Sequence, residues 1–286
     1  MLGDTLDYLL LRSLAHTRNR ATEEELDRRS GQAAGDAENA AAKLDKLVGR
    51  FDGHFPLDPS KRYLDMGCGP GDLTLALARR GIRRIDGVDF LPRYIQQAQA
   101  LAARSQPAAE VRFLCRDLRT WMPEEKYDVL LSFDALEHIG DPRAFLGKMA
   151  DFAAPGGRAV LAFGPLFHSP FGDHMWDFFK LQVPWRGVLF SENAILRVRR
   201  ECFRPTDPAS AYRDIAGGLN LMRYSDFLAY VRGAGWEFDY LAVNTFLRRM
   251  PPLRLACDAL MRVPGLRDYF VHNVYTVLRR RSVAPR

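Results

Sequence analysis

The chain has 286 residues, 47% of them hydrophobic and 27% charged, with 22 Gly and 17 Pro. This composition is typical of a folded globular protein and excludes intrinsic disorder, collagen-like repeats and low-complexity scaffolds. The formal net charge of +6 is unevenly distributed: residues 1–150 hold 22 basic and 23 acidic residues, whereas residues 151–286 hold 19 and 12. The positive second half suits an anionic substrate, a nucleic acid or an acidic membrane, or it is a solvated arginine-rich surface.

The first 60 residues are predicted to form an N-terminal helical cap of helices and loops. Apolar residues at helical spacing between Leu2 and Leu14 indicate an amphipathic helix. Such a helix packs on its own domain or, alternatively, makes peripheral contact with a membrane. Its acidic residues and short apolar run differ from a signal peptide, so stable membrane insertion is not expected. Two further helices are expected at Ala21–Arg29 and Asp36–Phe51.

The four cysteines, at positions 68, 115, 202 and 257, are far apart and form no Cys-x-x-Cys pair. Neither a zinc site nor a disulfide framework is therefore expected. Reduced thiols are typical of cytoplasmic proteins, and the sequence predicts a cytoplasmic location.

From residue 61 to residue 286 we predict one domain, in which short apolar segments alternate with helical segments. The predicted strands are Tyr63–Met66, Ile85–Asp89, Val111–Asp117, Tyr127–Phe133, Arg158–Phe163, Trp236–Phe246 and Phe270–Leu278. The predicted helices are Asp72–Arg80, Pro92–Ala103, Pro142–Phe152, Ser225–Gly233 and Leu253–Met261. Strands that alternate with helices indicate βαβ units, and thus an α/β fold whose parallel sheet has helices on both faces.

A glycine-rich turn follows the first predicted strand, in the sequence Asp65-Met66-Gly67-Cys68-Gly69-Pro70-Gly71-Asp72. Glycines at a strand-to-helix turn allow a tight turn and the close approach of a ligand to the backbone. The dinucleotide fingerprint G-x-G-x-x-G requires glycine where Asp72 stands, and a P-loop requires Gly-Lys-Ser/Thr, so the sequence favours neither. An acid before the turn suits a cationic ligand better than a pyrophosphate.

An acid followed by G-x-G-x-G resembles the first motif of the class I S-adenosylmethionine-dependent methyltransferases, in particular their small-molecule (type 11-like) group. The resemblance implies S-adenosylmethionine as the cofactor. It also implies a Rossmann-like, seven-stranded, mostly parallel sheet whose last strand is antiparallel. It assigns donor binding to Asp65, Gly67 and Gly69, and ribose binding to Asp89 at the end of the second strand, which Phe90 follows.

Later strand ends extend the resemblance. Asp117, after the third strand, is expected to meet the adenine amino group, with Leu118 as an apolar wall. The fourth strand ends at Phe133, which the family places near the methyl donor, and the chain continues as Ala135-Leu136-Glu137-His138. The turn Ala154-Pro155-Gly156-Gly157 matches the turn that precedes the family's fifth strand.

The acceptor chemistry requires a base if the acceptor atom is oxygen, because its proton must be removed during an in-line displacement. The candidate bases are His138, after the fourth strand, and His168 and His174, beyond the fifth strand. His168, His174 and Asp173 match no known spacing of metal ligands, and no metal is predicted.

Residues 164–221 interrupt the α/β alternation after the fifth strand, where related enzymes build a substrate lid. A lid here would place Phe167, Asp173, Trp176 and Trp185 against the acceptor. The density of aromatic residues is equally consistent with a satellite core under a long loop, or with the interface of a homodimer.

The predicted function is methyl transfer from S-adenosylmethionine to a small, partly apolar metabolite, at oxygen. The alternatives are C- or N-methylation of a small anionic or lipid-like acceptor, or a non-catalytic subunit that binds S-adenosylmethionine. A nucleic-acid partner is not expected, because amino-methylating enzymes usually carry N/D-P-P-Y/F where this chain has Ser132-Phe133-Asp134-Ala135.

Overall fold

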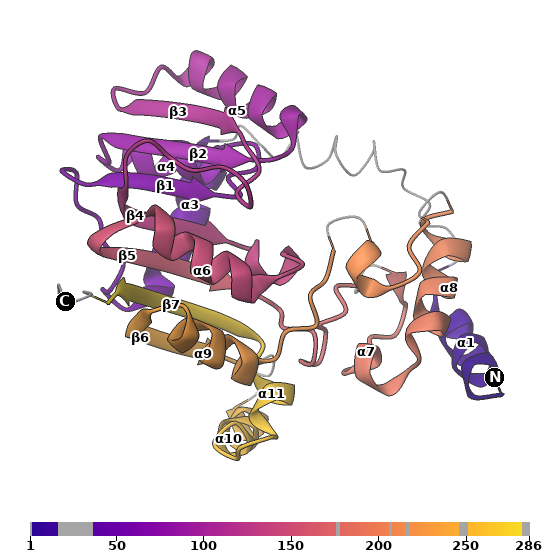
Figure 1. Ribbon diagram of the computed structural model, residues 1–286. Helices are drawn as coiled ribbons and strands as arrows, with labels where there is room; N and C mark the ends of the chain where they lie inside the picture. The colour runs from indigo at the N-terminus through magenta and orange to yellow at the C-terminus, as the bar shows by residue number, and fades with distance from the viewer. Residues whose placement is uncertain are drawn as a thin grey trace.

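The computed structural model describes residues 2–16, 37–175, 178–205, 208–215, 218–245 and 251–281. Within these ranges, seven strands form one sheet in the order β3-β2-β1-β4-β5-β7-β6 (Figure 1). The strands are β1 (Arg62–Met66), β2 (Arg84–Asp89), β3 (Glu110–Cys115), β4 (Tyr127–Phe133), β5 (Ala153–Phe163), β6 (Trp236–Asn244) and β7 (Asn273–Arg280). The strand order reverses between β1 and β4, which is the topological switch point where open α/β sheets bind ligands.

The pairing of the strands confirms the predicted fold class. β1 pairs in parallel with β2 on one side and with β4 on the other, so that Tyr63 lies opposite Ile85 and Val129. β7 is antiparallel to both of its neighbours, β5 and β6. The sheet is therefore mostly parallel with one antiparallel strand, the last in the chain.

Helices cover both faces of the sheet, so the central strands are buried on both sides. On one face lie α3 (Ala37–Val48), α4 (Asp72–Arg79) and α5 (Pro92–Ser105). On the other face lie α6 (Pro142–Phe152) and α9 (Tyr224–Gly233). Alternation along each strand supplies both cores: Leu64 and Leu130 point to the α6 face, whereas Tyr63 and Leu131 point to the α3 face.

The remaining helices lie beyond the sheet (Figure 1). They are α1 (Leu2–Leu14), α7 (Arg186–Leu189), α8 (Glu192–Cys202), α10 (Pro251–Leu260) and α11 (Arg267–Phe270). Short 3-10 turns are η1 (Gly49–Phe51), η2 (Leu136–His138) and η4 (Tyr212–Asp214).

The two N-terminal helices lie in different places. α1 packs on α8 of the insertion, where Leu11 and Ala15 are fully buried and the Asp7 carboxylate accepts a hydrogen bond from the Ser191 amide (2.8 Å). α3 packs on α4 beside the sheet, and its Leu44 is fully buried. The region predicted as one cap thus contributes separately to the insertion and to the sheet domain.

Some element boundaries differ from those predicted. β3 ends at Cys115, so Asp117 lies beyond the strand. β5 begins at Ala153, because Ala153 already pairs with Tyr127; the predicted Ala154–Gly157 turn lies in an irregularity of the register, and pairing resumes at Arg158. Phe270 ends the short helix α11, and β7 begins three residues later. The expected helix Ala21–Arg29 lies outside the described residues. Among the helices that the structure describes, none has the length and apolar character needed to cross a membrane.

Candidate active site

The glycine loop joins β1 to α4 and is held against β2. The amides of Gly67 and Cys68 both donate to Val88 O, at 2.8 and 3.1 Å. Gly67, Gly69 and Gly71 all have positive φ (78°, 52° and 85°), a conformation that other residues adopt only with strain.

The space around each glycine differs. A Cβ at Gly71 would lie 2.7 Å from Phe113, so this glycine is required for packing. A Cβ at Gly69 would meet no atom within 4 Å. The backbone at Gly69 therefore borders open space at the carboxyl end of β1, where a ligand can approach it.

Asp89 ends β2 with its carboxylate fixed by two backbone amides. Oδ2 accepts from Gly69 N (3.1 Å) and Oδ1 accepts from Leu91 N (2.9 Å). Each carboxylate oxygen has a second lone pair, so two vicinal hydroxyl groups can still donate to this side chain.

Asp65 is 3% exposed and serves the fold of the loop. Its carboxylate accepts a hydrogen bond from Thr74 Oγ1 (2.6 Å), which ties β1 to α4. Burial raises the pKa of Asp65 to about 6. The motif's acid thus lies beneath the glycine loop.

Asp117 and Leu118 follow β3 in a tight turn. The Asp117 carboxylate accepts from the Arg119 amide (2.9 Å) and from its guanidinium (2.6 Å to Nη2), and these bonds lower the pKa of Asp117. Leu118 is half-buried against the core of the α6 face. An adenine amino group would therefore compete with Arg119 for the Asp117 carboxylate.

The two predicted aromatic contacts differ in exposure. Phe90, after Asp89, is 68% exposed. Phe133, the last residue of β4, is 8% exposed and stacks on Phe55, with ring centroids 6.2 Å apart. Phe90 thus has a free face for a ligand, whereas Phe133 belongs to the core.

These residues fit S-adenosylmethionine at the carboxyl ends of β1, β2 and β4. The fit rests on the open space over Gly69 and on the carboxylate of Asp89, which is oriented by that glycine's own amide. Gly67 and Gly69 would accommodate the donor against the backbone, and Asp89 would bind its ribose hydroxyls.

His138 and His174 lie together beyond the end of β4. Their rings contact edge to face, with centroids 5.3 Å apart and planes at 88°. His138 is exposed at the end of η2, and its Nδ1 lies 2.8 Å from Gly218 O. Because a carbonyl oxygen only accepts hydrogen bonds, Nδ1 carries a proton, and in the neutral form of the ring Nε2 carries the lone pair.

His174 is also oriented by a backbone carbonyl. Its Nε2 lies 3.0 Å from Pro165 O, so that this nitrogen carries the proton. Burial lowers the pKa of His174, which keeps the ring neutral at neutral pH. His174 itself has a positive φ of 56°.

The third candidate base, His168, lies elsewhere. Its ring contacts Phe167 and Tyr269 of α11, with centroids 5.4 and 5.9 Å apart. Burial lowers its pKa, and Nδ1 is buried with no hydrogen-bond partner among the described residues. The structure thus brings together two of the three predicted histidines.

Glu137 is a buried acid that sequence reasoning did not select. It is 4% exposed, and its Oε1 accepts from the Gly164 amide (3.1 Å), where the insertion begins. Oε2 has no partner among the residues that the structure describes, and burial raises the pKa of Glu137 to about 8. The available sequence signal was an acid placed directly between the buried Leu136 and a candidate base.

The other residues predicted to bind substrate lie inside the insertion. Both Asp173 oxygens accept from Arg186, at 2.6 and 2.9 Å, and both side chains are 1% exposed. Phe167 joins a hydrophobic cluster with residues of α8 and α1. Trp185 donates from Nε1 to Tyr269 O (2.8 Å). Trp176 lies outside the described residues.

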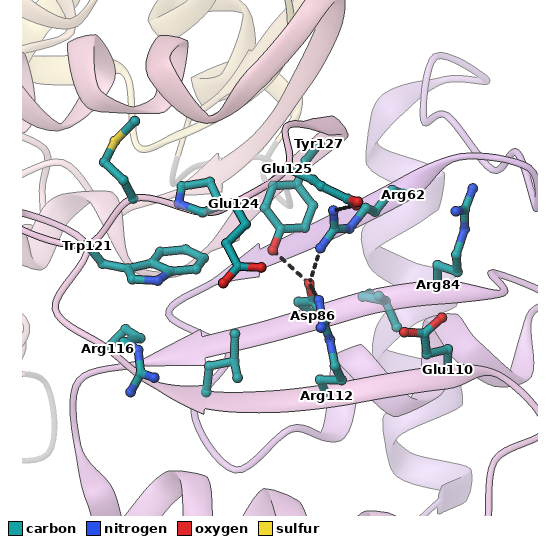
Figure 2. A pocket seen from close by; sticks show the side chains of 14 residues that line it. Arg62, Arg84, Asp86, Glu110, Arg112, Arg116, Trp121, Glu124, Glu125 and Tyr127 are labelled. Carbon is teal, nitrogen blue, oxygen red and sulfur yellow. Dashed lines mark hydrogen bonds and ion pairs between the residues drawn. The ribbon is translucent and has the colours of Figure 1, made fainter.

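A pocket of about 450 Å³ opens on the α6 face of the sheet, over β2 and β3 (Figure 2). The chain between β3 and β4 is a loop, so no crossover helix covers the sheet at this point. Figure 2 shows Arg62, Arg112 and Tyr127 converging on Asp86. Tyr127 Oη and Arg112 Nε both donate to that carboxylate at 2.7 Å. The pocket runs from the amino ends of the strands, and its four arginines face four acids, so we do not assign the active site to it.

Metal chemistry has no visible centre in the described ranges. Among these residues, no group of three or more His, Cys, Asp or Glu side chains is arranged to hold a metal ion.

Comparisons with known proteins identify the family. Residues 64–157 match the family described as a methyltransferase domain. Trans-aconitate 2-methyltransferase of Streptomyces coelicolor is 31% identical over 242 residues, covering 79% of this chain and 70% of that protein. The mitochondrial ubiquinone biosynthesis O-methyltransferase of Arabidopsis thaliana is 30% identical over 117 residues, 38% of this chain and 36% of that protein.

Solved structures share the fold at low sequence identity. Geranyl diphosphate C-methyltransferase from Streptomyces coelicolor, in complex with Mg²⁺, geranyl diphosphate and S-adenosyl-L-homocysteine, has a TM-score of 0.53 at 15% identity. That comparison covers 85% of this chain and 80% of the other. With the glycine loop and Asp89 in place, the chain belongs to the class I S-adenosylmethionine-dependent methyltransferases and is an enzyme that uses this cofactor.

Proposed function

We propose that the enzyme transfers the methyl group of S-adenosylmethionine to an oxygen atom of a small, partly apolar metabolite, with His138 as the base. The observation that carries this proposal is the hydrogen bond between His138 Nδ1 and Gly218 O. It leaves a lone pair on Nε2 of an exposed imidazole. That imidazole follows β4, the strand beside the glycine loop's own strand, β1.

S-adenosylmethionine, when bound, would supply a methyl group activated by its sulfonium sulfur, which would leave as the neutral thioether when the acceptor oxygen is methylated. His138 Nε2 takes the proton from that oxygen. Nδ1 keeps its own proton and its hydrogen bond to Gly218 O, which stabilises the imidazolium that forms. A positioned general base of this kind contributes about 10²–10⁴ in rate.

Donor binding in this proposal uses the loop and the strand ends. Gly69 allows close approach, and Gly67, whose Cβ would lie 3.3 Å from Ala135, lets the loop turn. Asp89 accepts from the ribose hydroxyls, and the exposed Phe90 ring contacts the adenosine. Asp117 and Leu118 border the adenine, with Arg119 displaced from the carboxylate it now pairs with. Asp65 and Phe133 act from within the core by holding the loop and the end of β4.

Acceptor binding uses the insertion, residues 164–221, as a lid. The supporting observation is that His174 lies in this segment and reaches His138. Phe167, Asp173 and Trp185 give the lid its shape through the hydrophobic cluster, the Arg186 ion pair and the anchor on Tyr269. The cluster already uses Phe167, Phe178, Phe179 and Phe190, so packing within one chain accounts for those aromatic residues without a dimer.

The names of the relatives agree with a small acceptor, and one of them specifies oxygen. The alternative is methylation of a carbon atom, as in the name of geranyl diphosphate C-methyltransferase. An experiment must distinguish it from methylation of oxygen. We place the reaction in the cytoplasm, because the cysteines are not joined in disulfides.

The test is a metabolite screen with methyl-labelled S-adenosylmethionine, followed by product identification by mass spectrometry and NMR. We expect a label on oxygen and a loss of about 10²–10⁴ in turnover in His138→Asn. His54→Asn, at an exposed histidine beside η1, is the matched control. A product labelled on carbon contradicts the oxygen assignment, and full activity in a folded His138→Asn variant contradicts the base.

A further inference from the structure

The chain that leaves the insertion crosses the η2 turn and is fastened there by one side chain. Asn220 Nδ2 donates to Leu136 O (2.6 Å) and to Ile139 O (2.8 Å). The Asn220 amide donates to Glu137 O (3.0 Å). Asn220 thus binds three backbone carbonyls of the turn that carries His138.

The carbonyl that orients His138 belongs to the same short segment. Gly218 lies two residues before Asn220, and its oxygen is the partner of His138 Nδ1 at 2.8 Å. Gly218 has a φ of 65°, and a Cβ there would lie 3.2 Å from His138 O. A glycine at this position therefore lets the segment approach η2 closely, and Asn220 holds it there.

The other end of the insertion is attached to the same turn. Glu137 Oε1 accepts a hydrogen bond from the Gly164 amide at 3.1 Å. The η2 turn is therefore bonded to the chain both where it enters the insertion and where it leaves it. The entering end depends on a side chain of the turn itself. The leaving end depends on Asn220, which is outside the turn and can be replaced without changing His138 or its neighbours.

From this geometry we infer that Asn220 is a positioning residue that keeps His138 protonated on Nδ1 and presents Nε2 to the acceptor. The inference rests on the proposed role of His138. A neutral imidazole can carry its proton on either nitrogen, and the nearby Gly218 carbonyl selects Nδ1. Without the two Asn220 side-chain bonds the segment is held to η2 by the backbone bond to Glu137 O and is less firmly placed, so Gly218 O can move away from Nδ1 and the proton can shift to Nε2.

The experiment measures the tautomer directly, without any acceptor. The protein carries ¹⁵N-histidine and is saturated with S-adenosylhomocysteine, and the ring nitrogens are observed by long-range ¹H–¹⁵N correlation. The chain has six histidines, and the His138 signals are assigned by their loss in His138→Asn. Wild type should show the proton of His138 on Nδ1.

Asn220→Ala and Asn220→Asp should both shift His138 toward a mixture of tautomers. Asp keeps the shape of Asn but places an oxygen against two carbonyls, so it separates loss of the donor from loss of volume. With the acceptor from the screen, we expect turnover about 10- to 100-fold lower, within the range of a lost general base. The pH dependence of turnover should also differ from that of wild type, while the Kd for S-adenosylmethionine stays within about threefold of the wild-type value.

Gln99→Ala is the matched control, because Gln99 Nε2 also donates to a backbone carbonyl, Phe113 O at 3.2 Å, from helix α5. It should leave the His138 signals and the rate unchanged. If Asn220→Ala does not fold, Asn220→Ser, which keeps one hydroxyl donor in place of the amide group, should shift His138 in the same direction by a smaller amount. Unchanged His138 nitrogens in a folded Asn220 variant overturn this inference alone, whereas full activity of His138→Asn overturns the proposed function on which it rests.

Discussion

The Gly69 amide donates to the Asp89 carboxylate at 3.1 Å, so the glycine loop after β1 and the acid at the end of β2 form one structural unit. The Leu91 amide holds the other oxygen at 2.9 Å. The acid is therefore oriented before any ligand arrives, and each of its oxygens keeps a second lone pair for a hydroxyl donor.

Asp89→Ala should weaken S-adenosylmethionine binding by about 1–3 kcal/mol, because a charged acceptor for two hydroxyl groups is removed. Asp117→Ala should have a smaller effect, because the Asp117 carboxylate already pairs with Arg119. Isothermal titration calorimetry on both folded variants makes the comparison. Equal affinity in wild type and Asp89→Ala would remove Asp89 from the ribose role.

Gly69→Ala and Gly71→Ala should separate ligand binding from stability. Both positions have positive φ, so both variants carry backbone strain of about 1–2 kcal/mol. Only at Gly71 does the new methyl group collide with Phe113, which adds about 1–3 kcal/mol of overpacking. Denaturant unfolding should therefore show that Gly71→Ala is the less stable variant. Calorimetry should show that Gly69→Ala loses more affinity for S-adenosylmethionine than its loss of stability alone would cause. The reverse ranking in both measurements would contradict the assignment of the open space to the donor.

His174→Ala and His168→Ala form a second pair. His174 contacts the His138 ring and is held by Pro165 O, so its loss should lower turnover about tenfold, less than the 10²–10⁴ expected for the base itself. His168 packs on Tyr269, and its replacement should leave turnover near that of wild type. Steady-state kinetics measures turnover in both variants, and the affinity for S-adenosylmethionine serves as the control. Equal losses in the two variants would point to general damage of the insertion rather than to the histidine pair.

Glu137→Gln should stabilise the protein at alkaline pH. The folded pKa is raised from 4.5 to about 8 by burial, so the folded state binds more protons than the unfolded state between these values. The contribution of Glu137 to stability is fully present below pH 4.5 and is lost as the pH rises through about 8. The neutral glutamine still accepts from Gly164 and avoids the buried charge, and we expect a gain of about 1–3 kcal/mol at pH 9.

The measurement is the free energy of unfolding in urea at pH 5 and pH 9. The gain should shrink toward pH 4.5, and Glu124→Gln, at an exposed acid, should show no such pH-dependent difference. A gain independent of pH in Glu137→Gln would mean that the carboxyl is not the titrating group.

The sheet and the donor loop were largely predictable because their signals are local. Alternating apolar segments located all seven strands, and the acid-G-x-G-x-G turn identified the family before any contact was known. Asp89 follows from its place at a strand end. The predicted strand starts at Arg158 and Phe270 were wrong, because a local sequence pattern does not distinguish a strand end from a register irregularity or a short helix.

The acceptor side was less predictable because its contacts join residues far apart in the chain. His138 meets Gly218 across 80 residues, and Asn220 meets Leu136 across 84. No periodicity or motif links such positions. The aromatic residues of the insertion were consistent with a lid, a satellite core or a dimer interface, which have similar compositions. Several of these residues pack in a hydrophobic cluster to which the distant helix α1 contributes.

The docking of α1 on α8 has a consequence for engineering this enzyme toward other acceptors. A chimera that replaced residues 164–221 with the corresponding segment of another methyltransferase would leave Leu11 and Ala15 without their cluster and Asp7 without Ser191. The graft would also expose the surface of α1 that α8 now covers. The unit that can be exchanged is therefore discontinuous in the gene: the insertion and the first helix must be transplanted together.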